Sequence, residues 1–251
     1  MRIHIIACRV LTRELEYYAS QSEHVTDITW LPQGLHNTPD KLRAMVKASL
    51  EALYEQVESS EVRHAPDVIA LGYGLCSNGI VGIEAKDIPI VVPRTDDCIA
   101  LFTGSQARYL ELFKKHNGTY WLNNGWIETS FYQYEGWEER LLRKYTELYG
   151  EENAEFLLEQ EKLWVRNYNT CGFITSPVYH NPEYPAIARQ FAKRNGWDYV
   201  QIEGNTRMLQ KLTRGAWNDR EFLICPPGHR IEASFDEWKI KAVPCAGTGK
   251  D

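Results

Sequence analysis

The sequence predicts an α/β protein with two Rossmann-like lobes joined by a helical crossover. Short apolar runs rich in β-branched residues alternate with amphipathic segments, and a highly charged segment at 135–166 separates two such regions. A chain of 251 residues is long enough for two lobes. We expect an N-terminal lobe at 1–118, an aromatic loop and crossover at 119–166, and a C-terminal lobe at 167–251, with a cleft between the lobes.

The first lobe should be a doubly wound parallel sheet. Apolar runs are typical of strands buried on both faces, and they occur at 3–7, 68–71 and 88–92, with a further strand expected at 26–31. A helix is expected at 12–19, where apolar residues share one face. A second helix is expected at about 40–57, after Thr38 as the N-cap and Pro39 as the first helical residue.

The later elements are expected to repeat this alternation more weakly. A helix should span 104–115, a short strand and turn should lie within 118–128, and two helices should follow that break at Gly150. In the C-terminal lobe we expect helices at 184–195 and 207–214, closed by Gly196 and Gly215. Strands are expected at 198–202 and 221–225.

Composition restricts the classes of partner. The formal net charge is −6 and the isoelectric point about 5.7, so the chain lacks the basic field that holds nucleic acid, and nucleic acid is an unlikely partner. No apolar run reaches membrane-spanning length, and residues 1–7 enter a strand directly, so we expect a cytoplasmic protein without membrane contact. In that compartment the six cysteines should be reduced, catalytic or metal-bound.

Three cysteines follow predicted strands in the same way. Cys8, Cys76 and Cys98 each come after an apolar run, and the carboxyl ends of parallel strands meet at one edge of a sheet. Converging thiolates are ligands for an iron–sulfur cluster or for one soft metal ion. The alternative is that they are ordinary small core residues.

A glycine-rich stretch, GYGLCSNGIVG, surrounds Cys76. Its glycines allow positive φ values and a close approach of the backbone to a bound group, so Gly74, Asn78 and Gly79 are candidates for cofactor binding. The stretch is neither a dinucleotide-binding fingerprint nor a Walker loop.

Charged residues accompany two of these cysteines. Asp96 and Asp97, in RTDDC, are candidates for a general base, although an aspartate before a helix is commonly only a cap, and we favour the cap for at least one of them. Arg9 and Arg94 are candidates for binding an anionic group at the same sheet edge. Alternatively, the two arginines only pair with the aspartates.

The second half offers further candidates. Cys171 could be a fourth ligand, or it could act catalytically at an iron left open by the other three thiolates. Trp126 belongs to a segment rich in aromatic and amide groups that suits a planar ligand, although packing is the commoner role of such a tryptophan. His229 is interpreted as a surface residue before a ligand, Cys225 as part of a turn, and Cys245 has no assigned role.

Several motifs together resemble one known family. The segments IIACRVL, YGLCSNG, VPRTDDCIALFTGS, GTYWLNNGWIE and FLICPPG resemble the bacterial and archaeal family called domain of unknown function 1638. The resemblance implies an anaerobic setting, often near corrinoid-dependent methyl transfer, and a cysteine pattern like Cys8, Cys76 and Cys98. The layout also resembles that of small desulfidases that hold a four-iron cluster by three cysteines, a likeness of arrangement only.

Three functions follow as hypotheses. The first is an iron–sulfur enzyme, lyase-like or desulfidase-like, with a [4Fe–4S] cluster and a small-molecule substrate in the interlobe cleft. The second is a corrinoid-binding accessory protein that works with a corrinoid protein or a methyltransferase, although the usual D-x-H-x-x-G corrinoid pattern is missing. The third is a non-enzymatic metal carrier, for example of zinc.

Overall fold

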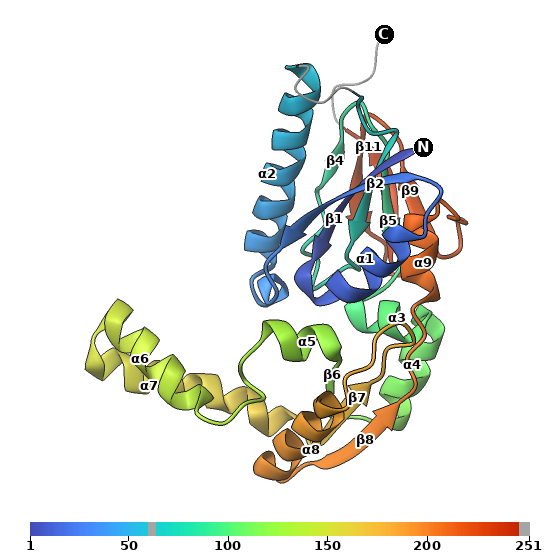
Figure 1. Cartoon of the computed structure of the whole chain (residues 1–251). Helices are drawn as coiled ribbons and strands as arrows, with labels where there is room; N and C mark the ends of the chain where they lie inside the picture. Colours follow the sequence, from blue (N-terminus) through green and yellow to red (C-terminus); the bar gives the residue numbers. More distant parts are fainter. Residues whose placement is uncertain (60–63, 246–251) are drawn as a thin grey trace. The chain divides into compact units, whose positions relative to one another are not determined.

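The chain forms two compact units in the computed structural model, which describes residues 1–59 and 64–245 (Figure 1). The first unit contains Met1–Tyr109 and the segment from Asn205 onward, and the second contains Leu110–Gly204. Both are mixed α/β structures with sheets of their own. The predicted α/β class is therefore confirmed, while the Rossmann-like detail of each lobe stays a prediction.

A five-stranded, mostly parallel sheet forms the centre of the first unit. Its strands, in spatial order, are β2 (Val25–Leu31), β1 (Arg2–Cys8), β3 (Val68–Gly72), β5 (Ile90–Pro93) and β9 (Phe222–Cys225). The first four are parallel, and β9 runs antiparallel to β5. All residues of β3 and β5 are buried, which explains why these strands are continuous apolar runs.

Helices connect and cover these strands. They are η1 (Arg9–Leu11), α1 (Thr12–Ser20), η2 (Leu35–Asn37), α2 (Pro39–Glu58), α3 (Cys98–Thr103) and α9 (Arg207–Thr213). The buried residues of α2 are those expected from a 3.6-residue period: Leu42, Val46, Leu50, Leu53 and Tyr54. Pro39 begins α2 as predicted, but the Thr38 side chain makes no capping hydrogen bond.

The second unit contains a parallel three-stranded sheet of β6 (Thr119–Leu122), β7 (Thr170–Ile174) and β8 (Asp198–Ile202). Its helices are α5 (Asn124–Thr129), α6 (Trp137–Tyr149), α7 (Glu151–Leu163), η3 (Trp164–Asn167) and α8 (Glu183–Asn195). The chain passes from the first unit to the second within α4 (Gln106–Lys115). No helix among the described residues is both long and apolar enough to cross a membrane.

The structure divides the chain differently from the expected boundaries. The segment predicted to complete a C-terminal lobe returns to the first unit, where β9 pairs with β5. There β10 (His229–Ala233) also pairs with β11 (Ile240–Pro244) and β4 (Glu84–Ala85) in a small antiparallel sheet. Within 118–128 the expected short strand is β6, and helix α5 stands where a turn was expected. Local periodicity predicts a strand but does not say which sheet it joins, and for that reason the boundaries differ.

Arg94 ties β5 to this returning segment. Its Nε donates hydrogen bonds to the carbonyl oxygens of Asp219 at 2.8 Å and Phe222 at 3.3 Å. Its Nη1 donates to the carbonyl oxygens of Trp238 at 3.0 Å and of Ile240. The guanidinium carbon also lies 5.0 Å from the centre of the Trp238 ring. A single charged side chain thus satisfies several backbone acceptors of the C-terminal segment.

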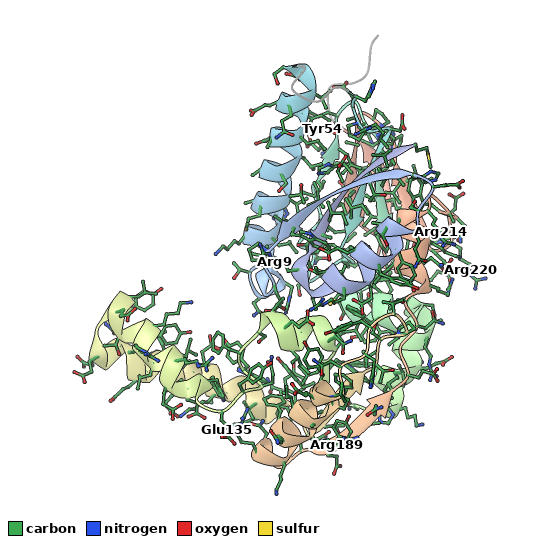
Figure 2. The ribbon with its side chains drawn as sticks, viewed as in Figure 1. Arg9, Tyr54, Glu135, Arg189, Arg214 and Arg220 are labelled. Carbon is green, nitrogen blue, oxygen red and sulfur yellow. The ribbon has the colours of Figure 1, made fainter. Side chains whose placement is uncertain are left out.

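We expect Arg94→Ala to lower the free energy of unfolding by roughly 2–3 kcal/mol, because hydrogen bonds from a charged donor are lost together. Urea unfolding of the metal-free protein measures the change. The exposed Arg220, labelled in Figure 2, provides the control, and Arg220→Ala should change stability by less than about 0.5 kcal/mol. Equal effects of the two substitutions would contradict a structural role for the Arg94 contacts.

Candidate functional site

Three cysteines lie at the carboxyl ends of three adjacent parallel strands. Cys8 is the last residue of β1, Cys76 follows β3, and Cys98 follows β5 as the first residue of α3. The strands are in register, since Ala7 pairs with Gly72 and Ile69 with Ile90. The structure therefore brings the three predicted thiols to one edge of the sheet.

Two backbone hydrogen bonds join the loops that carry Cys76 and Cys98. The N–H of Leu75 donates to the carbonyl of Thr95 at 2.7 Å, and the N–H of Cys76 donates to the carbonyl of Asp96 at 2.8 Å. Gly74 allows this close approach, because an added Cβ would lie 2.5 Å from Thr95 Oγ1 and 2.7 Å from its carbonyl oxygen. These contacts hold the loop that carries Cys76 against the loop that carries Cys98.

The backbone turns through a left-handed conformation at Cys76. Cys76, Ser77 and Asn78 have φ values of 47°, 57° and 66°, although none of them is glycine. Each such residue costs roughly 1–2 kcal/mol in an L-amino acid chain. Hydrogen bonds hold the turn: Gly79 N–H donates to the Cys76 carbonyl at 3.0 Å, and Arg43 Nη2 donates to the Asn78 carbonyl at 3.0 Å. Backbone strain of this kind is typical of functional sites.

Cys8 and Cys76 are buried and Cys98 is half-buried, and thiol charges contribute to the pKa values of Cys76 and Cys98. Burial raises the pKa of Cys8 to about 11. Burial also raises the pKa of Cys76 and of Cys98. The charges of Asp97 and Cys8 raise both pKa values further, and the charge of Cys76 adds to the effect on Cys98. A thiolate at one position disfavours ionisation of the others, so these thiols hold their protons in the absence of metal. A metal must therefore displace those protons when it binds.

Backbone N–H groups partly offset this penalty. A hydrogen bond from Val10 lowers the pKa of Cys8, and hydrogen bonds from Gly74 and Cys98 lower that of Cys76, although burial has the larger effect. Amide N–H groups aimed at cysteine sulfur stabilise the thiolate form, which is the form that binds metals.

Two buried hydroxyl groups lie beside the thiols without a hydrogen-bond partner among the described residues. They belong to Tyr73, which is 4% exposed and directly follows β3, and to Thr95, which is fully buried after β5. Burial and the charges of all three thiols raise the pKa of Tyr73, so its hydroxyl stays protonated and can donate. An unpartnered buried hydroxyl is costly and therefore uncommon.

Asp97 caps helix α3, as predicted for at least one of the two aspartates. Its Oδ1 accepts a hydrogen bond from the N–H of Ile99 at 2.8 Å, and its Oδ2 accepts one from the hydroxyl of Tyr109 at 3.0 Å. Burial nevertheless raises the pKa of Asp97. Asp96 forms an ion pair with Lys239, Nζ to Oδ1 at 2.9 Å. A general-base role for either carboxylate stays a prediction.

The two arginines occupy different surroundings. Arg9, labelled in Figure 2, is exposed at the end of β1, on the same sheet edge as the thiols. The guanidinium of Arg94 is instead committed to the backbone carbonyls described above. The ion pair of Asp96 is with Lys239 rather than with either arginine. Anion binding by the arginines stays a prediction, and Arg9 is the better placed of the two.

The glycines near Cys76 are needed for packing more than for positive φ. Of the four glycines between residues 72 and 82, Gly82 alone has a positive φ, of 80°. A Cβ on Gly79 would lie 2.5 Å from Leu42 of α2, and Gly74 lies against Thr95. The expected positive φ values fall on Cys76, Ser77 and Asn78 instead, because hydrogen bonds and burial of the thiol compensate for the strain.

Cys171 lies in the second unit, within β7. It is fully buried in an apolar cluster that includes Leu122, Phe173 and Phe191, and burial raises its pKa to about 12. Trp126, on α5, packs against the same cluster. These surroundings agree with the packing role given as the alternative for Trp126, and they make Cys171 a core residue of the second unit. Their predicted roles at a metal centre or a cofactor stay untested.

The remaining sequence candidates lie in the first unit. Cys225 is fully buried at the end of β9, and Cys245 follows β11, where its N–H donates to the Gly228 carbonyl at 2.9 Å. His229 begins β10 and is half-buried. Within the described part of the chain, no group of three or more His, Cys, Asp or Glu side chains is arranged to hold a metal ion. An iron–sulfur cluster requires a different arrangement of ligands from a single metal ion, because each thiolate binds a different iron.

Sequence reasoning missed Tyr73, Thr95, Tyr109 and Lys239 as neighbours of this edge. The sequence contained a signal for Tyr73 and Thr95, because each lies directly or closely after a predicted apolar strand. Lys239 had none, because it is separated from Asp96 by 143 residues and reaches it through the returning C-terminal segment.

Comparison with known families now identifies the chain's relatives. The matching family model is described as protein of unknown function (DUF1638), and the match covers residues 30–213. The chain belongs to this family. Cys76 and Cys98 lie within the matched residues, whereas Cys8 precedes them. The chain matches no curated protein and no solved structure.

The raised pKa of Asp97 predicts a pH dependence of stability. A carboxyl whose folded pKa exceeds its ordinary value of 3.8 contributes stability at low pH and loses that contribution as the pH rises through the folded pKa. Asn retains the capping oxygen, so Asp97→Asn should gain stability relative to the unsubstituted protein as the pH rises above 3.8. Urea unfolding of the metal-free proteins between about pH 3 and 8 measures this difference.

Asp236 is the control for this experiment, because hydrogen bonds lower its pKa, beginning with the bond from Ser234. Asp236→Asn should change the pH dependence in the opposite direction, and by less because Asp236 is exposed. A pH-independent difference between the Asp97→Asn protein and the unsubstituted protein would contradict the raised pKa of Asp97.

Proposed function

We propose that Cys8, Cys76 and Cys98 hold a [4Fe–4S] cluster, and that the protein uses it as an enzyme acting on a small molecule. The observation that carries this proposal is the convergence of three thiols, two buried and one half-buried, after the ends of β1, β3 and β5. Ligands of open α/β folds bind at this edge of the sheet.

The local electrostatics support a cationic group at this position. Cys76 and Cys98 lie close to Asp97 and Cys8, and the charges of Asp97 and Cys8 raise the pKa of both thiols. Thiolates in such surroundings need positive charge close by, which iron ions supply. The N–H groups directed at Cys8 and Cys76 resemble the hydrogen bonds that tune sulfur ligands in such sites.

Three thiolates occupy three irons of a four-iron cluster, and this count supports enzymatic use over electron transfer alone. A cluster held by these three cysteines would supply Lewis-acid chemistry at its remaining iron for an oxygen or sulfur atom of a substrate. Among the chain's own residues, Arg9 is exposed at this edge and suits an anionic substrate, while Asp97 is placed to hold a proton. A Lewis acid, an anion-binding arginine and a proton-holding carboxyl together suit a desulfidase-like or lyase-like reaction.

Cys76→Ala should abolish iron binding in protein purified without oxygen, because it removes one of three ligands. The unsubstituted protein should contain about four irons per chain, as a [4Fe–4S] cluster requires. Iron analysis and visible absorbance measure the iron content of the variant and of the unsubstituted protein. The control is Cys225→Ala, which removes an equally buried thiol at the end of β9 and should leave iron content unchanged. The sharp bands of a corrinoid, or a colourless protein with one zinc, would instead support the alternatives.

Cys171→Ser tests whether the cluster has a fourth thiolate. Because Cys171 is enclosed in the apolar core of the second unit, the substitution should leave iron content and absorbance unchanged. It should lower the free energy of unfolding by roughly 1–3 kcal/mol, the cost of burying a hydroxyl without a partner. Loss of iron with this variant would show that Cys171 is a ligand and would contradict an open iron.

A further inference from the structure

The hydroxyl of Tyr73 is a buried donor without a partner among the described residues. Tyr73 is 4% exposed, and the Thr95 hydroxyl nearby is also unpartnered. Buried hydroxyls that the chain itself leaves unpaired are candidates for contact with a bound group. Tyr73 is the better candidate, because the backbone of Gly74 already crowds the Thr95 hydroxyl. A Cβ placed on Gly74 would lie 2.5 Å from Thr95 Oγ1.

The position of Tyr73 points to the group it contacts. It follows Gly72, which pairs with Ala7 beside Cys8, and it precedes Cys76 by three residues. Its phenol interacts electrostatically with Cys8, Cys76 and Cys98, which are the three thiols that define the proposed centre. The tyrosine thus stands among the ligands rather than at the periphery of the unit.

We propose that the Tyr73 hydroxyl donates a hydrogen bond to a sulfur atom of the cluster and so raises the cluster's reduction potential. This inference rests on the proposed function, since it requires a cluster on the three cysteines. Reduction adds negative charge to the cluster, so a donor to sulfur stabilises the reduced form more than the oxidised form. Because burial raises the pKa of Tyr73, the phenol keeps its proton and acts as a donor in both states.

The experiment compares the unsubstituted protein with Tyr73→Phe, which retains the ring and removes only the hydroxyl. Both proteins are loaded with iron without oxygen and titrated with reductant while the reduced cluster is followed by electron paramagnetic resonance. We expect equal iron content. At a fixed potential, the ratio of reduced to oxidised cluster should fall by about tenfold, which is ~59 mV for a one-electron couple.

Tyr54→Phe is the matched control. Tyr54 is similarly buried in the same unit, at 5% exposed, and its hydroxyl accepts a hydrogen bond from Lys86 N–H at 3.2 Å (Figure 2). Its removal should leave the potential unchanged. In the iron-free protein, Tyr73→Phe should raise the thermal unfolding midpoint, because it removes a buried polar group that has no partner there.

The outcomes separate the two proposals. An unchanged potential in the Tyr73→Phe protein, or loss of its iron, would overturn the role of the hydroxyl as a tuning donor. If the unsubstituted protein itself binds no cluster, the proposed function fails, and this result is visible before any variant is made. A potential that shifts equally with Tyr54→Phe would also overturn the inference, since the effect would then not be local.

Discussion

Parallel pairing of β1, β3 and β5 is the constraint on which the candidate site depends. Because the three strands run in the same direction and in register, the segments that follow them begin at one edge of the sheet. These segments supply the cysteines, Tyr73 and the aspartates. Antiparallel placement of any one strand would move its cysteine to the opposite edge. The chemistry of the site therefore follows from the direction of the strands as much as from the identity of the residues.

The site carries costs that the rest of the first unit must offset. Three features are unfavourable by themselves: three consecutive left-handed residues, two hydroxyls without a partner among the described residues, and a half-buried carboxyl with a raised pKa. They are concentrated within loops held by backbone hydrogen bonds and by a fully buried strand pair. A protein selected for stability alone has no need of this concentration, and the proposed cluster would relieve part of it by neutralising thiolates.

Periodicity predicted most elements, because short-range spacing determines which face of a helix or strand is apolar. It predicted the inward residues of α2 and the break between α6 and α7 at Gly150. It did not distinguish buried from exposed apolar positions in those later helices, where Phe156 is 63% exposed. It gave no range for α3, whose six residues are too few to show a period, and the predicted aspartate cap was the only sign of that helix. For the site, strand ends alone were enough to group the three cysteines.

The sequence by itself determined the α/β class, the main parallel strands and the three cysteines that follow them, since all of these depend on residues close together in the chain. Only the tertiary structure decided that β9, β10 and β11 return to the first unit, and that Lys239 pairs with Asp96 across 143 residues. It also decided that Cys171 lies in a different core from the other three thiols. These outcomes depend on which distant surfaces pack and pair best, and no local pattern contains that information.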